Sequence, residues 1–208
     1  MLNMLRKDYI ALKSSQWIVI LYLVVFSTVF IPRMDMSMYF VGIYTAIGSI
    51  MLATMVDIKN HNHRFLITLP INRKHIVKAK YLTAIAYMLF AVFSSFGIHW
   101  LTIRLFPLLD KPNYTFNDII ISIGIILLLI SVYMPLFYAL SHKSAAVINA
   151  VFLVALIVLA QPAAQFIHWL SEESQWQSPI TLFVYPGILL LFLVSYLVSV
   201  KLFSRRDI

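Results

Sequence analysis

The sequence contains no cysteine and few glycines, and each shortage removes a class of function. Without cysteine the chain forms no disulfide, thiolate metal site, thiol nucleophile or lipid-anchoring thioester. Its five glycines are scattered and none belongs to a G-K-[ST] motif, so the chain lacks a phosphate-binding loop and we do not expect it to hydrolyse ATP itself. The close pair His61 and His63 has no acidic cluster beside it, so we expect no metal site.

Charge is also scarce, and apolar residues take its place. Hydrophobic residues make up 62% of the 208 positions and charged residues 12%, whereas soluble domains average about 45–50% and 25%. We therefore predict an all-α polytopic membrane protein, with residues 1–208 forming one transmembrane domain. A span needs about 20 apolar residues. The predicted spans cover about 17–31, 38–56, 82–103, 119–140, 145–160 and 180–203.

The basic residues are distributed unevenly over the connecting segments. With the termini and the segments after the second and fourth spans on one side, that side holds 13 of the 16 Lys and Arg residues. The other side holds Arg33, Arg104 and Lys111. The positive-inside rule then places both termini in the cytoplasm. The net charge of +8 is explained as a topology signal and requires no nucleic-acid partner.

Three segments outside the spans have amphipathic patterns. Residues 1–16 repeat apolar side chains at helical spacing and predict an interfacial helix, although a charged stub that only orients the first span is the alternative. The segment from Asp57 to Lys80 changes from polar to apolar, breaks at Pro70 and continues from Arg73 as a basic helix into the third span. Residues 161–173 predict an outer amphipathic, re-entrant helix before the sixth span.

The predicted spans contain almost no ionisable groups. No Asp, Glu, Lys or Arg falls in their central parts, and only His99 and Asn149 stand out. A proton-coupled transporter or cation channel would be expected to keep carboxylates in its pathway, so this class is disfavoured. For His99, a packing or interfacial role is favoured over a proton relay.

Small residues recur every four positions in the second span, at Thr45, Ser49 and Ala53. Such a stripe allows close helix approach, either inside one bundle or between two subunits. We assign these residues, with Tyr133 and Phe137, as candidates for a pathway or dimer contact; packing within one bundle is the favoured alternative for the stripe.

The segment after the second span resembles the membrane subunits of type-2 ABC exporters. In that family an acidic residue opens the loop, a leucine-rich piece ends in proline, and a helix with a basic start and a later lysine enters the third span. Asp57, Leu69-Pro70, Arg73 and Lys80 match these features in order. The six-span layout and the outer amphipathic element extend the resemblance over the whole chain.

The resemblance implies a non-catalytic permease that forms half of a translocation pathway. Separate cytoplasmic ATPase subunits would bind ATP and Mg²⁺, and a second copy or a homologous chain would complete the pathway; this chain would bind no cofactor. Residues from Asp57 to Thr68 would form a coupling helix seated in the ATPase, with Phe65 and Leu66 as apolar anchors and Asp57, Arg64 and Arg73 as polar contacts. The alternative is that Phe65 and Leu66 lie on the bilayer or beneath the bundle.

The scarcity of charge in the spans predicts a lipophilic or amphipathic substrate. The small chain is most similar to bacterial exporters of amphipathic or antimicrobial peptides, including toxin-like modulins, which would place it in a bacterial cytoplasmic membrane and in peptide export or resistance. Two other classes stay open: an ATPase-independent secondary transporter or channel, and a structural, sensor or immunity subunit.

Overall fold

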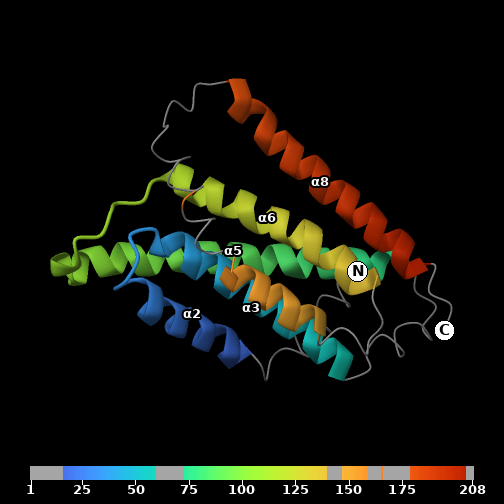
Figure 1. Ribbon diagram of the computed structural model, residues 1–208, viewed down its shortest axis with the longest axis horizontal. Helices are drawn as coiled ribbons and strands as arrows, with labels where there is room; N and C mark the ends of the chain where they lie inside the picture. The colour runs from blue at the N-terminus through green and yellow to red at the C-terminus, as the bar shows by residue number, and fades with distance from the viewer. Residues whose placement is uncertain (1–15, 60–72, 140–146, 159–164, 166–178, 205–208) are drawn as a thin grey trace.

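The computed structural model describes residues 16–59, 73–139, 147–158, 165 and 179–204, and the regular secondary structure within these ranges consists of helices alone (Figure 1). The helices are α2 (Gln16–Phe30), α3 (Ser37–Lys59), α5 (Arg73–Leu105), the short 3₁₀ helix η1 (Pro107–Leu109), α6 (Phe116–Ala139), a helix at Val147–Val158, and α8 (Pro179–Ser204).

A helix occupies each of the six predicted span ranges. Four of them are long and apolar enough to cross a membrane, namely Ser37–Lys59, Arg73–Leu105, Phe116–Ala139 and Tyr185–Ser204. The helices at Gln16–Phe30 and Val147–Val158 are apolar but shorter, so their crossing of the membrane stays a prediction. The expected interfacial and outer amphipathic helices fall outside the described residues, apart from Gln16, which begins α2, and Gln165. Of the expected coupling segment only residues 57–59 are described; Asp57, predicted to open the loop, lies instead in α3, which continues to Lys59.

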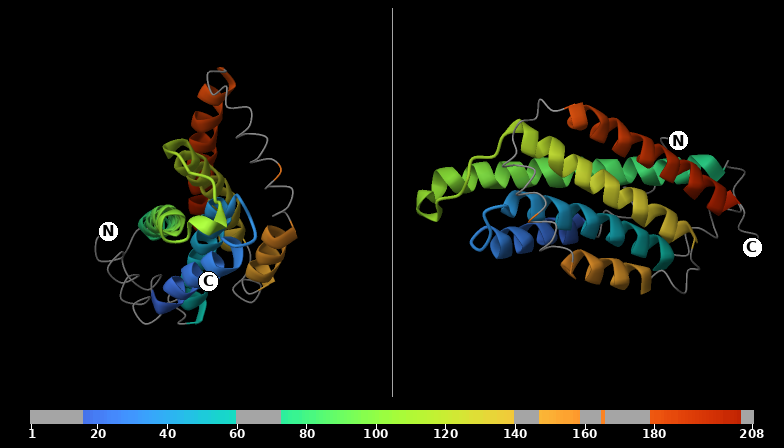
Figure 2. Two further views of the ribbon diagram at one scale, coloured as in Figure 1. Left: turned by 90° about the vertical axis from the view of Figure 1, so that its left-hand side faces the viewer. Right: turned by 45° about the horizontal axis from the view of Figure 1, so that its top comes forward.

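The expected long helix at Arg73 is confirmed. α5 runs for 33 residues without interruption from the basic segment to Leu105. At about 1.5 Å per residue it is roughly 50 Å long, well beyond the 30 Å of a bilayer core. Figures 1 and 2 show its C-terminal end projecting beyond its neighbours, and in Figure 1 α2, α3, α6 and α8 slope in the same direction while α5 runs at an angle to them.

Long-range contacts show that successive helices alternate in direction. Near the start of α3, Met38 O accepts a hydrogen bond from Ser95 late in α5, and near its end Asp57 pairs with Lys80 early in α5, so these helices are antiparallel. α3 and α6 are parallel, because Tyr39 bonds to Asp118 and Thr54 contacts Tyr133.

The core lies around α3. This helix packs against α2, α5 and α6, and its largest fully buried side chains include Met38, Tyr39 and Ile47. α2 and α3 approach closely at Gly48, where an added Cβ would lie 3.1 Å from the Tyr22 ring. α8 packs on α5 and α6 and leaves a broad apolar face exposed, as expected for a helix at the edge of a membrane bundle.

Candidate functional site

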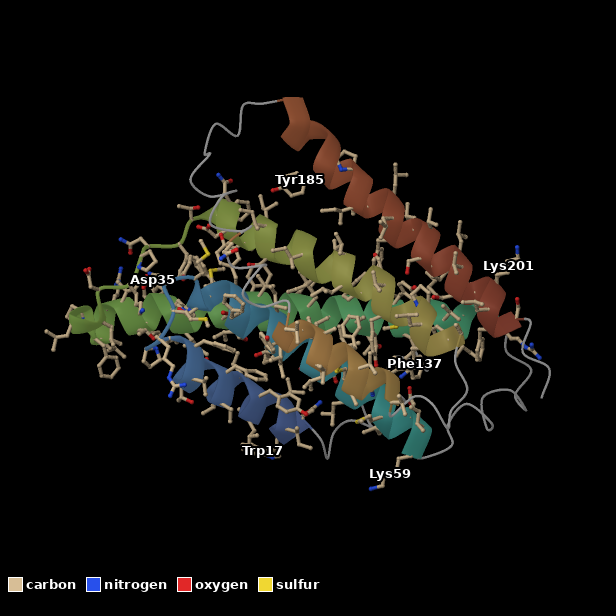
Figure 3. The ribbon with its side chains drawn as sticks, viewed as in Figure 1. Trp17, Asp35, Lys59, Phe137, Tyr185 and Lys201 are labelled. Carbon is tan, nitrogen blue, oxygen red and sulfur yellow. The ribbon has the colours of Figure 1, made fainter. Side chains whose placement is uncertain are left out.

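The alternation of the helices brings basic residues from three helices to one end of the bundle. We call this the basic end. Among the described residues it carries Lys59, Arg73, Lys74, Lys78, Lys80 and Lys201, with Asp57 as its acidic residue. Figure 3 shows Lys59 and Lys201 at this end and Asp35 at the other. The opposite end is balanced in charge, with Arg33, Arg104 and Lys111 against Asp35, Asp110 and Asp118 in the described part of the chain.

An ion pair between Asp57 and Lys80 joins α3 to α5 at the basic end. The Lys80 ammonium contacts Asp57 Oδ2, and both side chains are largely shielded, with exposed fractions of 10% and 13%. In such an environment a charge is tolerated when it is paired, and removing one partner leaves the other uncompensated. The pair therefore fixes the last turns of α3 against the early part of α5.

Arg73 ties the start of α5 to the end of α8. Its Nη1 donates a hydrogen bond to the backbone carbonyl of Ser204, at 2.8 Å. The last carbonyls of a helix lack intrahelical partners and carry a partial negative charge, which a guanidinium satisfies and stabilises. Thus Asp57 and Arg73, both predicted as coupling residues, lie at the same end of the bundle and hold α3, α5 and α8 to one another.

Three buried polar residues lie about one helical turn farther into the bundle than the Asp57–Lys80 pair, and they connect α3 to two further helices. The Tyr133 hydroxyl on α6 donates to Asn149 Oδ1 at 2.7 Å and lies 2.6 Å from Thr54 Oγ1. All three residues are nearly inaccessible to solvent. Asn149, singled out by the sequence, is therefore part of a bond network that links α3, α6 and the Val147–Val158 helix.

The whole chain was compared with protein families, curated proteins and solved structures. The family described as "ABC-2 family transporter protein" matches residues 3–204. The chain belongs to the ABC-2 transporter family. No curated protein and no solved structure gave a significant match. The protein is thus the membrane component, or permease, of an ABC transporter, a class that is generally non-catalytic and works with an ABC ATPase.

Three of the predicted coupling residues of the permease, the polar contact Arg64 and the apolar anchors Phe65 and Leu66, belong to the segment between α3 and α5. Arg64, Phe65 and Leu66 lie outside the described residues, so their assignment as coupling contacts stays a prediction. Their position in the chain is nevertheless bounded, because they connect Lys59 at the end of α3 to Arg73 at the start of α5, and both of these residues lie at the basic end.

The small-residue stripe of the permease lies inside the subunit. Thr45, Ser49 and Ala53 are buried, and the Ser49 hydroxyl donates to the Thr45 carbonyl at 2.6 Å. This placement agrees with packing inside one bundle, the alternative that the sequence analysis favoured. Tyr133 is likewise buried, and Phe137 is half-buried with its ring between Tyr133 and Tyr138.

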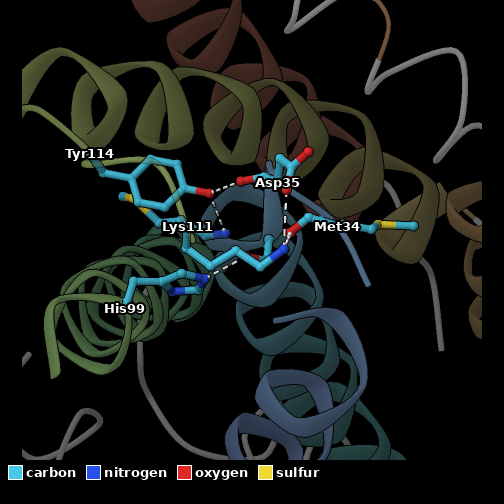
Figure 4. A network of polar contacts seen from close by, with 7 residues as sticks. Met34, Asp35, His99, Lys111 and Tyr114 are labelled. Atoms are coloured by element: carbon cyan, nitrogen blue, oxygen red, sulfur yellow. Dashed lines mark hydrogen bonds and ion pairs between the residues drawn. The ribbon is translucent and has the colours of Figure 1, made fainter. Parts of the chain in front are cut away.

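The opposite end of the permease contains a polar network that the sequence analysis missed (Figure 4). His99 Nδ1 lies 2.9 Å from the Ser95 carbonyl, which can only accept, so Nδ1 carries the proton. Nε2 then accepts from the Ser37 hydroxyl at 2.7 Å. Lys111 pairs with Asp35 at 3.1 Å. The network joins the start of α3 to α5 through Ser37, and the connection before α3 to the segment before α6 through Asp35.

Two tyrosines extend this network. Tyr114 donates its hydroxyl proton to the Asp35 carbonyl, and burial raises the pKa of the Tyr114 phenol above its ordinary value, which keeps it a donor. Tyr39 on α3 donates to Asp118 on α6. Asp118 Oδ2 also accepts from the Thr115 amide at 2.6 Å and from the Thr115 hydroxyl at 2.8 Å, and these bonds fix the start of α6.

The network was missed because its members are far apart in sequence. Ser37 and His99 are separated by 62 positions, and Tyr39 and Asp118 by 79. His99 itself drew attention, and its favoured packing role agrees with its hydrogen bonds. The described residues contain no group of three or more His, Asp or Glu side chains that could hold a metal ion.

Proposed function

We propose that this permease forms half of a translocation pathway and receives mechanical work at its basic end from cytoplasmic ABC ATPase subunits that bind ATP and Mg²⁺. The observation that carries the proposal is the convergence of Lys59, Asp57, Arg73 and the start of the long α5 helix at one end of the bundle. The segment that contains Arg64, Phe65 and Leu66 connects two helices at this end, where an ATPase would reach it. The positive-inside rule assigns this end to the cytoplasm.

α5 is suited to transmit motion through the bilayer. It is a single uninterrupted helix that begins in the basic segment and ends beyond the far side of the bundle. The Asp57–Lys80 pair and the Arg73–Ser204 bond would pass a displacement of the coupling segment to α3 and α8 as well. ATP-driven closure of the two ATPase subunits would then tilt several helices together.

The substrate we propose is lipophilic or amphipathic, such as a cytolytic or antimicrobial peptide, and the direction is export. This rests on the apolar character of the helices, in which ionisable groups gather at the two ends, and on the resemblance to small peptide exporters. A second copy or a homologous permease would supply the other half of the pathway, in a bacterial cytoplasmic membrane.

The test is to co-purify the permease with an ABC ATPase encoded beside it and to measure ATP hydrolysis and peptide export in vesicles. The paired change Phe65→Asp and Leu66→Asp should abolish association and ATP-dependent export. The control replaces two exposed apolar residues of α8 by polar, uncharged ones, Leu190→Asn and Leu197→Asn, and should leave ATPase association intact. Full association of the Phe65/Leu66 variant, or export without ATP, would contradict the proposal.

A further inference from the structure

The end of α5 and the turn after it form an apolar tip that is exposed in the subunit. The tip consists of Leu105, Phe106, Leu108 and Leu109, together with Pro107. Leu105, Phe106 and Leu108 have exposed fractions of 68%, 59% and 99%. The tip is the part of α5 that projects beyond the neighbouring helices in Figures 1 and 2. Large apolar side chains gathered at a free tip require an apolar or interfacial environment.

The tip continues a stripe on α5 that faces away from the bundle. The exposed residues along this helix recur at helical spacing: Leu89, Phe90, Phe93, Trp100, Leu101, Arg104 and Leu105. The residues between them, including Met88, Val92 and His99, are buried against the other helices. The stripe lies on a helix long enough to span the bilayer, so we expect lipid to cover it. Because the tip continues the stripe, the same lipid would also contact the tip.

Arg104 marks the depth of the tip. It is the charged residue of the stripe, and its guanidinium lies 4.1 Å from the centre of the Trp100 ring. Tryptophan prefers the level of the headgroups, and a long basic side chain extends from apolar surroundings toward phosphates. Lys80 and Arg104 are 24 positions apart, or roughly 36 Å along the helix, which matches a core of about 30 Å with one charge beyond each face.

The chain turns back immediately after this level. Pro107 begins the short helix η1, and Asp110 adopts a left-handed conformation with a φ of 40° that ends it. The polar residues of the following segment, Lys111 and Tyr114, bond back to Asp35. The apolar residues of the turn are therefore left on its outer side, while Lys111 and Tyr114 are held against the bundle.

We propose that this tip is a lipid anchor, which dips into the headgroup region of the leaflet opposite the basic end. Its partner is the interfacial layer of the bilayer, with Arg104 at the phosphates and Phe106 and Leu108 among the upper acyl chains. α5 runs at an angle to the neighbouring helices in Figure 1, and a tilt of α5 from the membrane normal would bring its projecting end down to the interface instead of into water. The anchor holds the far end of α5 while its basic end moves.

The absence of cysteine from the chain gives a direct test. A single Leu108→Cys variant is labelled with an environment-sensitive fluorophore and reconstituted in phosphatidylcholine–phosphatidylglycerol vesicles. Asn113→Cys, an exposed polar position in the same connection, is the matched control. Quenching by aqueous iodide, present on both sides of the membrane, is compared with quenching by lipids that carry a nitroxide near the headgroup end of the acyl chain.

The Leu108 label should emit at shorter wavelength, be quenched by the nitroxide lipid and be protected from iodide, and the Asn113 label should show the reverse. Strong iodide quenching at Leu108 without lipid quenching would overturn the anchor. Protection from both quenchers would also overturn it, since this indicates burial against protein. Phe106→Cys provides a second labelling position if Leu108→Cys does not fold. The test needs neither ATPase nor substrate, so its outcome is independent of the proposed function.

Discussion

At the basic end, α3 and α5 are joined by an ion pair between Asp57 and Lys80, whereas at the opposite end they are joined by uncharged groups such as Ser37 and His99. The basic end carries a large excess of positive charge, and the opposite end is balanced. An ionic contact depends strongly on its partner and surroundings, while a satisfied set of neutral hydrogen bonds fixes one arrangement. The ionic contact therefore suits the basic end, which we propose receives motion from the ATPase. The neutral hydrogen bonds suit the opposite end, where they keep the helices in register.

The largest expected effect comes from breaking the ion pair at the basic end. Lys80→Met removes the ammonium that contacts the shielded Asp57 carboxylate and should destabilise the protein by about 3 kcal/mol. Thermal unfolding in nanodiscs measures the change. Adding Asp57→Asn to this variant should recover most of the loss, because the uncompensated charge is then removed. If the double variant loses as much as the sum of the single ones, the pair is not coupled.

The next effect should come from the buried Tyr133 hydroxyl. Tyr133→Phe removes the donor to Asn149 and the contact with Thr54, and we expect a loss of about 2 kcal/mol. Tyr196→Phe is the matched control, since its ring packs on Tyr81 and its hydroxyl makes no hydrogen bond among the described residues. Equal losses for the two variants would show that the hydrogen bonds of the Tyr133 hydroxyl contribute no stability beyond that of an unbonded hydroxyl.

A smaller effect is expected at the opposite end. Ser37→Ala leaves His99 Nε2 without its donor in a buried site and should cost about 1.5 kcal/mol. Since neither group is a permanent charge, the loss should be the same at low and high salt. If the loss of stability varied with salt concentration, the contact between Ser37 and His99 would have ionic character, and the contrast between an ionic end and a neutral end would fail.

The smallest effect should come from the exposed ion pair at that same end. The Asp35 side chain is 84% exposed, and such pairs contribute about 0–1 kcal/mol. Asp35→Asn should therefore shift the unfolding midpoint very little. The bond from Tyr114 is retained, because it goes to the Asp35 backbone carbonyl. A loss as large as that of Lys80→Met would remove the distinction between shielded and exposed pairs.

The positions of the helices could be predicted from the sequence because a membrane-spanning helix requires a continuous run of apolar residues, which is visible in the sequence. α6 at Phe116–Ala139 and α8 at Pro179–Ser204 lie within a few residues of the predicted spans. The start of α5 at Arg73 was also predictable, because Pro70 interrupts the chain just before a continuous helix-forming segment.

The contacts between helices could not be predicted in the same way. Periodicity shows that Thr45 and Ser49 share a face but does not show which helix covers it, and the structure places this face inside the subunit. Hydrogen bonds such as Tyr133 to Asn149 depend on helix register, which leaves no local signal in a sequence of apolar spans. One long-range feature could be predicted. Because each span reverses the direction of the chain, the order of the spans assigns every basic residue to one of the two ends of the bundle.

The central claim, that the basic end receives the ATPase, is tested most directly by crosslinking. Because the chain has no cysteine, single substitutions can place one reactive thiol at each end of the bundle. Lys59→Cys lies at the basic end (Figure 3), and Asn113→Cys lies at the opposite end, next to Tyr114, which bonds to Asp35. Each variant is incubated with the ABC ATPase encoded beside it and treated with a short photoactivatable thiol reagent. The account predicts a crosslinked ATPase band from Lys59→Cys and none from Asn113→Cys; crosslinks from Asn113→Cys alone, or from neither variant in an active complex, would contradict it.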